Sequence, residues 1–187
     1  SSGKIIISTD ADCRVGKDWV LNMTQSTITS DGITIGFSKI KALNKFHKYQ
    51  LLDFLGIITA NAGAAGWGSF WSGTGQNLAY FKKDYEKING FIPVKNEISG
   101  DDMYLVQSIS KFKTGAININ SKSYVTTLPM NTLKEFINQR IRWASNSKKN
   151  ISTNKLFFLF LLSTYLINNL ILVSIFFNSN WFKIFFI

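Results

Sequence analysis

Two aspartates, Asp10 and Asp12, come directly after an apolar run at residues 4–9 (KIIIST). Side chains at positions i and i+2 of an extended segment point the same way, so the two carboxylates can converge. We expect them at the carboxyl end of a parallel strand, where α/β proteins bind their ligands. Paired carboxylate oxygens suit Mg²⁺ or Mn²⁺, which commonly share their coordination with substrate phosphates. An aspartate pair after a strand is also ordinary turn chemistry, and the pair alone leaves both interpretations open.

A second acidic pair, Asp101 and Asp102, follows Ser99 and Gly100 and opens an expected helix at residues 102–112. One interpretation is an N-terminal cap with an acidic first turn. The other is a general base, a carboxylate that accepts a proton from a substrate hydroxyl. Both aspartates cannot easily be capping residues, so one of them is available for chemistry.

The segment QRIRW at residues 139–143 lies in an expected amphipathic helix at residues 132–146. At 100° per residue, Gln139, Arg142 and Trp143 share one face. Amide, guanidinium and indole groups together can hold a diphosphate and stack against a sugar ring. The alternative is a basic helix beside a membrane, with a tryptophan at the interface. The expected buried side of this helix contains Leu133, Ile137 and Ala144, with Arg140 at its border and Asn131 as the N-cap.

A glycine-rich stretch, SGTGQNLAY at residues 72–80, is the fourth motif. Gly73 and Gly75 would let the backbone pass close to a ligand. The pattern GxxxxGK[ST] of a phosphate-binding loop is not found in this sequence. A tight turn that leads into a helix is an equally good interpretation.

The elements expected around these motifs form a mixed α/β domain over residues 1–150. Its strands are expected at residues 4–9 (parallel and buried on both faces), 33–37 (half-buried) and 115–119. Its helices are expected at residues 47–60, with Leu51, Leu55 and Ile58 on one side, and at residues 76–88, 102–112 and 132–146. Residues 63–75 are expected to be loop and short strand.

Residues 156–177 contain no charged side chain. As a helix they would extend roughly 33 Å, enough for a hydrocarbon core of about 30 Å. We therefore expect a transmembrane region at residues 151–187, with a truncated apolar segment after residue 177; a buried helix of a soluble protein is the alternative. The residues before it are mainly basic, so we expect the preceding domain on the cytoplasmic side of the membrane. These basic residues are Lys134, Arg140, Arg142, Lys148, Lys149 and Lys155.

The composition narrows the possible functions. The chain has 187 residues and a net charge of +10, so its partners are expected to be anionic. The single cysteine, Cys13, excludes an internal disulfide, and the single histidine, His47, excludes a site that needs two histidines. The basic residues gather beside the expected membrane helix and do not alternate with stacking aromatic residues, so we expect no nucleic-acid partner.

The four motifs, in this order, resemble those of family 2 glycosyltransferases, especially the membrane-bound enzymes related to cellulose and hyaluronan synthases. The matching segments are TDADC (9–13), SGTGQNLAY (72–80) with NGF (89–91), SGDD (99–102) and QRIRW (139–143). The resemblance implies an α/β fold of the Rossmann-like GT-A type. Relative to that family, the chain is expected to be N-terminally truncated, because the nucleoside-binding half would precede residue 1.

The resemblance further implies an inverting, metal-dependent transfer of a sugar from a nucleotide-sugar to a hydroxyl of a glycan or a lipid-linked acceptor. Membrane lipids are an expected partner. Asp10 and Asp12 would hold Mg²⁺ or Mn²⁺, and Asp102 would take the proton of the acceptor hydroxyl. The donor and acceptor contacts would come from Asp101, Gly73, Gly75, Asn77, Gln139, Arg140, Arg142 and Trp143.

Two other functions compete with this one. A haloacid-dehalogenase-like phosphatase also has two aspartates after an apolar strand, but Arg14 stands where that family needs Thr or Val-like chemistry, and QRIRW would have no role. A catalytically degenerate, membrane-anchored interaction subunit is the alternative outside enzymes. The presence of Asp10, Asp12 and Asp102 together argues against such a decayed site.

Overall fold

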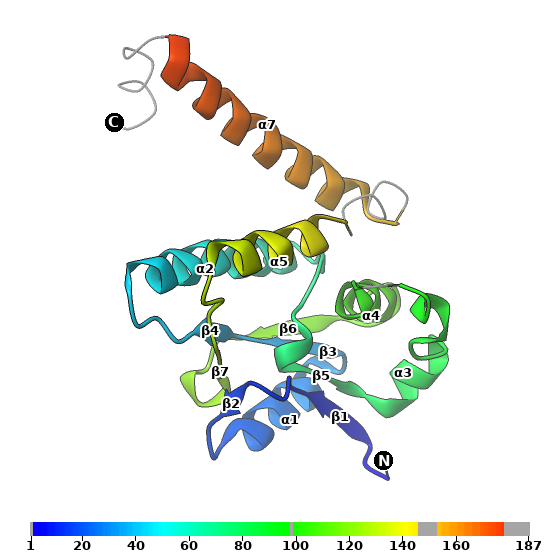
Figure 1. Ribbon diagram of the computed structural model, residues 1–187. Helices are drawn as coiled ribbons and strands as arrows, with labels where there is room; N and C mark the ends of the chain where they lie inside the picture. Colours follow the sequence, from blue (N-terminus) through cyan, green and yellow to red (C-terminus); the bar gives the residue numbers. More distant parts are fainter. Residues whose placement is uncertain (1, 98, 146–152, 178–187) are drawn as a thin grey trace. The chain divides into compact units, whose positions relative to one another are not determined.

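The computed structural model describes residues 2–97, 99–145 and 153–177 (Figure 1). The chain divides into two compact units, Ser1–Arg140 and Ile141–Ile187, and each is described by itself. The first unit is mixed α/β, as the sequence predicts.

The main sheet of the first unit has four strands in the order β1-β5-β3-β6. Strand β5 lies antiparallel to both of its neighbours, β1 and β3, whereas β3 and β6 are parallel. The four strands are β1 (Ile5–Ser8), β5 (Leu78–Phe81), β3 (Ile33–Gly36) and β6 (Gly115–Asn118). Residues 5–8 form a strand as predicted, but the expectation of a parallel strand buried on both faces was wrong. Strand β1 is partly buried, lies at the edge of the sheet and is antiparallel to β5. Strand β3 is a strand as predicted, but all four of its residues are buried.

Residues 76–88 do not form the expected single helix. They contain the 3₁₀ turn η1 (Gly75–Asn77), then β5, and then the short helix α3 (Lys82–Lys87). In β5, Leu78 and Tyr80 join one apolar cluster while Ala79 joins the other. This alternation is the period of two that a strand between two covering layers requires.

Two helices cover opposite faces of the main sheet. Helix α4 (Asp101–Ile109) contributes Leu105, Val106 and Ile109 to one apolar cluster, as predicted, together with side chains of β3 and β5. Helix α1 (Trp19–Ser30), which the sequence analysis missed, contributes Trp19 and Met23 to the other. Each fully buried aliphatic side chain contributes about 1.5–3 kcal/mol to stability.

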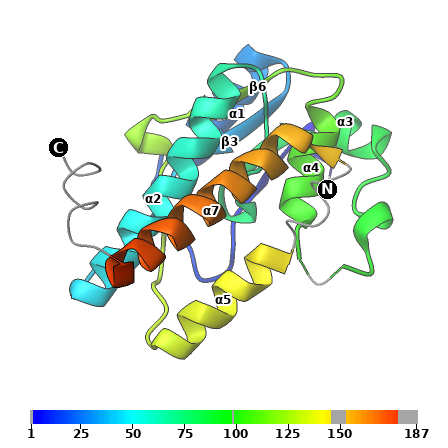
Figure 2. The same cartoon turned by 90° about the horizontal axis from the view of Figure 1, so that it is seen from above.

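A second sheet and the long helix α2 (Lys45–Gly66) complete the first unit. The sheet has the order β2-β7-β4, with β2 (Arg14–Val15), β7 (Val125–Thr127) and β4 (Ser38–Ile40). Two further 3₁₀ turns are η2 (Ile92–Val94) and η3 (Ser121–Ser123). Helix α2 and helix α4 lie apart from each other when the molecule is viewed from above (Figure 2).

Helix α2 begins at the cap Asn44, whose side chain accepts a hydrogen bond from the His47 N–H. It continues to Gly66, beyond the expected end at residue 60 and into the stretch expected to be loop. Its buried residues are His47, Gln50, Phe54 and Ala64, whereas the expected apolar positions Leu51, Leu55 and Ile58 are only partly buried. Contacts with the rest of the fold thus select a different side of the helix, one that includes the polar Gln50.

Helix α5 (Leu133–Ser145) forms where it was expected. Its N-terminus is capped by Thr132 and not by Asn131: the Thr132 hydroxyl accepts from the Glu135 N–H, and the Glu135 carboxylate accepts from the N–H groups of Asn131 and Thr132. This reciprocal pairing is a capping box. The expected buried side was wrong, because Phe136 is buried while Leu133 and Ile137 are 62% and 46% exposed and Ala144 is exposed.

The second unit contains the long helix α7 (Lys155–Phe177), so the helix expected at residues 156–177 is confirmed. Hydroxyl and amide groups interrupt its apolar surface, and Ser163, Thr164 and Asn169 donate to carbonyls of the preceding turn. Among the described residues, no helix is long and apolar enough to cross a membrane. This finding does not support the predicted membrane crossing. The apolar segment expected after residue 177 lies outside the described residues.

Candidate active site

The first acidic motif lies in a tight turn after β1. The Cys13 N–H donates to the Asp10 carbonyl over 3.1 Å, so the residues between them form a turn and not the extended segment that the spacing suggested. The turn nevertheless brings the carboxylates together: one ligand atom each of Asp10, Asp12 and Cys13 lies within 4.8 Å of the others. Both aspartates are exposed and can reach a ligand.

The second acidic motif begins helix α4. Its N-cap is Gly100, whose φ of 93° is in the left-handed region that favours glycine. Asp102 uses its carboxylate on two backbone groups: Oδ1 accepts from the Met103 N–H at 2.7 Å, and Oδ2 accepts from the Gly75 N–H at 3.3 Å. Asp102 therefore connects the start of α4 to the glycine-rich loop, and Asp101 remains exposed beside it.

The surroundings of Asp102 make its carboxyl group more basic than usual. Burial raises the pKa of Asp102, and the negative charges of Asp101 and Asp10 raise it further. The hydrogen bonds from the backbone N–H groups of Met103 and Gly75 oppose this shift. A carboxylate with a raised pKa accepts a proton more readily, which is the property that a general base needs.

These interactions bring together three motifs that are far apart in the sequence. Asp10 and Asp12 come from the turn after β1, Gly75 from the loop before β5, and Asp102 from the first turn of α4. The charge of Asp10 acts on the carboxyl group of Asp102, and the Gly75 N–H binds it directly. Acidic groups are thus concentrated beside a backbone N–H, as a site for a cation and a polar substrate requires.

Two residues expected near the ligand, Asn77 and Gly73, are packed within the fold. Asn77 is fully buried; its amide accepts from the Trp19 indole and donates to the carbonyls of Phe37 and Ser123. A Cβ on Gly73 would lie 2.7 Å from Leu78 Cδ2, so the glycine permits close packing under the loop. Of the loop residues, only Gly75 is shown in contact with a site carboxylate.

The QRIRW motif extends over the boundary between the two units. Gln139 and Arg140 belong to the first unit, whereas Arg142, which is exposed, and Trp143, which is partly buried, belong to the second. Arg140 forms an ion pair with Asp53 of α2, and its guanidinium lies 4.5 Å from the centre of the Phe136 ring. The Arg140 side chain thus points toward α2, whereas the sequence predicted it among the donor contacts.

The family model described as glycosyl transferase family 21 matches residues 2–187. The chain belongs to glycosyl transferase family 21. This family 21 protein is therefore a glycosyltransferase, an enzyme that requires a nucleotide-sugar donor and an acceptor. The expected enzyme class is confirmed, whereas the match does not support the assignment to family 2. No curated protein matches the chain.

The acidic turn of this family 21 enzyme contains side-chain groups that fit a divalent cation as ligands. Two exposed carboxylates supply the hard oxygen ligands that Mg²⁺ and Mn²⁺ prefer. The third nearby group is the Cys13 thiol, and burial together with the charges of Asp12 and Asp10 raises its pKa. A raised pKa favours the protonated thiol, so the two carboxylates are the groups of this turn that suit a hard cation.

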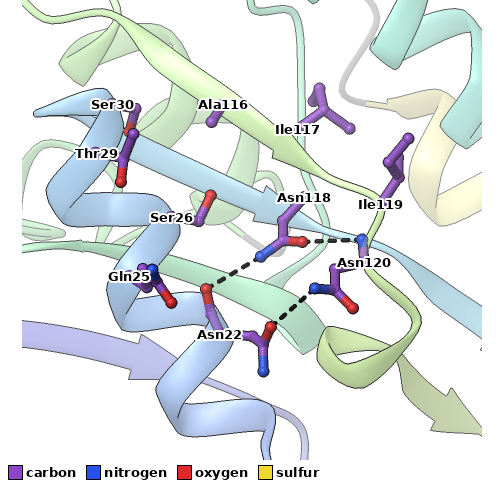
Figure 3. Close-up of a pocket in the computed structure, with 10 residues that line it drawn as sticks. All are labelled: Asn22, Gln25, Ser26, Thr29, Ser30, Ala116, Ile117, Asn118, Ile119 and Asn120. Carbon is purple, nitrogen blue, oxygen red and sulfur yellow. Dashed lines mark hydrogen bonds between the residues drawn. The ribbon is translucent and has the colours of Figure 1, made fainter.

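A polar groove of about 530 Å³ lies elsewhere on the family 21 enzyme, between α1 and β6 (Figure 3). Its amides largely bond to one another: Asn118 donates to the Asn22 carbonyl and accepts from the Asn120 N–H, and the Asn120 amide donates to the Asn22 side chain. The groove has no signal in the sequence, because its two walls come from segments almost 100 residues apart. It contains no carboxylate, and we assign it no part in the transfer.

Proposed function

We propose that this family 21 enzyme transfers a sugar with inversion from a nucleotide-sugar to a hydroxyl group, using Asp102 as general base and a divalent cation held by Asp10 and Asp12. The observation that supports this proposal most directly is the position of Asp102, whose carboxyl group accepts from Gly75 and experiences the charge of Asp10.

In the proposed reaction, the Asp102 carboxylate takes the proton from the acceptor hydroxyl. The acceptor oxygen forms a bond with the anomeric carbon of the donor as the bond from that carbon to the diphosphate oxygen breaks. The nucleoside diphosphate leaves with the electron pair of that bond. A general base of this kind accelerates a reaction by about 10²- to 10⁴-fold.

Asp10 and Asp12 would hold Mg²⁺ or Mn²⁺ through their carboxylate oxygens. The bound cation supplies neutralisation of the negative charge that develops on the departing diphosphate. The two aspartates are exposed in the turn after β1, so a donor diphosphate can approach them from solvent.

We also propose that the enzyme works at the cytoplasmic face of a membrane, on a glycan or a lipid-linked acceptor. The exposed apolar side chains Leu133, Ile137 and Ile141 share one side of α5, and Lys134 lies next to them. An amphipathic helix with basic residues can lie in the interface of an anionic membrane. Flotation with anionic and neutral lipid vesicles tests this location. Binding to the anionic vesicles would support it, and binding to neither kind of vesicle would contradict it.

The experiment that tests the transfer uses the natural reading frame that contains these residues. A panel of nucleotide-sugars is supplied with Mn²⁺ or Mg²⁺ and with glycan or lipid acceptors, and the release of nucleoside diphosphate is measured. The Asp102→Asn variant is measured in parallel, with Asp31→Asn as the matched control. Asp31 is a surface carboxylate paired with Lys113 and lies outside the proposed site.

Release from one donor that is lost in Asp102→Asn and kept in Asp31→Asn would support the proposal and identify the sugar. Release that persists in Asp102→Asn would remove this residue from the role of base. If the folded wild-type protein releases nothing from any donor, the catalytically degenerate interaction subunit becomes the better hypothesis.

A further inference from the structure

Helix α2 holds the segment that leads into α5 through a buried glutamine. Gln50 is almost fully buried, with 1% of its surface exposed. Its amide donates to the Met130 carbonyl, and its side-chain oxygen accepts from the Met130 N–H, both over 2.9 Å. The two bonds satisfy both backbone groups of a residue that lies 80 positions away in the sequence. This pairing fixes the chain just before the Thr132 cap of α5.

About one turn after Gln50 in α2, and about two turns into α5, the two helices are joined by an ion pair. Asp53 forms an ion pair with Arg140, and both side chains are largely shielded from solvent, at 32% and 22% exposure. Aromatic contacts lie beside the ion pair, since the Phe136 ring packs edge-on against Phe46 and Tyr49, each at 5.9 Å between ring centres. The two helices approach each other near their N-terminal ends in the view from above (Figure 2).

The side of α5 that faces α2 therefore contains Phe136 and Arg140, which are four residues apart and lie one above the other on a helix. Holding Arg140 fixes the rotation of α5 about its axis. If α5 shifted by one residue relative to α2, all of its side chains would turn by about 100° about the helix axis. Gln139, the first residue of the QRIRW motif, depends directly on that rotation.

We propose that Gln50 and Asp53 of α2 are positioning residues for the transfer reaction, and that Arg140 is the anchor through which Asp53 sets the rotation of α5. In this role Arg140 stabilises the position of α5 and does not bind the donor diphosphate, in contrast to the role expected from the sequence. The proposal rests on the proposed function for its kinetic part, because Gln139 matters for donor contact only in a transferase.

The decisive variants are Asp53→Ala, Arg140→Ala and the charge-exchanged double variant Asp53→Arg/Arg140→Asp. They are made in the natural reading frame, with Asp31→Ala as a control that breaks another ion pair. Three measurements are made: kcat and KM for the donor, the Mn²⁺-dependent binding of uridine and guanosine diphosphates as probes, and amide hydrogen exchange of residues 136–140.

We expect each single variant to lower kcat by about ten- to hundredfold, the loss that a small displacement of a positioning group produces. Diphosphate affinity should change little, and exchange at residues 136–140 should become faster. The double variant should recover most of the kcat and the slow exchange, because it restores an opposite-charge pair. Asp31→Ala should resemble the wild type in all three measurements.

A different pattern would overturn the proposal. If Arg140 binds the donor, Arg140→Ala and the double variant both lose diphosphate affinity, Asp53→Ala keeps it, and the exchange of charges rescues nothing. If Asp53→Ala does not fold, Asp53→Asn and Gln50→Met provide the same comparison with smaller changes in volume. Unchanged exchange in all variants would also contradict the anchoring role.

The exchange measurement separates this inference from the proposed function. If the wild type shows no transfer but exchange at residues 136–140 depends on the Asp53–Arg140 pair and is rescued by the double variant, the proposed function fails and the anchoring of α5 remains. If transfer is present and exchange does not respond to the pair, the positioning inference fails alone.

Discussion

The acidic centre around Asp102 and the contact between α2 and α5 differ in how their charges are arranged: like charges lie together at the first, and opposite charges are paired at the second. Asp102 is partly buried near two other aspartates, and its pKa is raised by burial and by their negative charges. Arg140 is also partly buried, but it faces the opposite charge of Asp53 and the ring of Phe136. Like charges that are brought together repel and cost stability, whereas the attraction between opposite charges offsets part of the cost of removing them from water. For this reason we propose chemistry at the first region and anchoring at the second.

The strongest test of this difference is Asp102→Asn. We expect kcat to fall by about 10²- to 10⁴-fold, because the amide cannot take the acceptor proton. Binding of the donor, measured by calorimetry, should survive, since the diphosphate contacts are elsewhere. A loss of donor binding equal to the loss of turnover would contradict the assignment of Asp102 as a base and make it a binding residue.

The next largest effect is expected for Asp10→Ala and Asp12→Ala. Each change removes a charged oxygen ligand, so Mn²⁺ affinity should fall by at least about tenfold. Electron paramagnetic resonance of Mn²⁺ measures this without any substrate. Asp31→Ala serves again as the control, and Mn²⁺ binding that is equal in all three variants would place the cation elsewhere.

Asn77 provides a test of packing against ligand binding. Its position in the glycine-rich motif suggests contact with a ligand, whereas in the structure its side chain is fully buried. Asn77→Ala leaves the Trp19 indole N–H and two buried carbonyls without the partner that they have now. We expect the free energy of unfolding to fall by about 3 kcal/mol. Chemical denaturation measures this loss, with Asn61→Ala as a control on α2. Normal stability together with a raised KM for the donor would return Asn77 to the ligand site.

The smallest effect expected is a shift in pH dependence. Because the pKa of Asp102 is raised, the acid limb of kcat/KM should lie above the usual aspartate value of about 3.9. The raised pKa also means that protonated Asp102 favours the folded state; this contribution is complete below the ordinary pKa and is lost as pH rises through the folded pKa. Activity should therefore increase with pH in the window where the contribution of Asp102 to stability decreases. Thermal unfolding and kinetics over the same pH series measure both trends.

Local patterns in the sequence were sufficient for several elements. The spacing of Leu105, Val106 and Ile109 predicted a helix with its buried side, and the structure has both in α4. The strand at β6 and the helices α5 and α7 also lie where they were expected. The periodicity of a helix is set by residues within one or two turns, so it can be seen without knowledge of the rest of the fold.

Other features depended on partners far away in the chain. Residues 78–81 form a strand that β1 and β3 pair with on both sides, where the sequence predicted a helix. The buried side of α5 is Phe136, which packs against Phe46 and Tyr49 of α2, and the expected Leu133 and Ile137 remain exposed.

The sequence by itself determined which groups are available for chemistry, namely the two acidic pairs, the glycine loop and the QRIRW motif, and it identified a glycosyltransferase. Only the tertiary structure decided the surroundings of those groups. It placed Asp102 between Gly75 and the charge of Asp10, enclosed Asn77 within the fold and gave Arg140 a partner 87 residues away. Residue types and short spacings are local, whereas burial and the choice of an ionic partner are set by chain segments that meet only after folding.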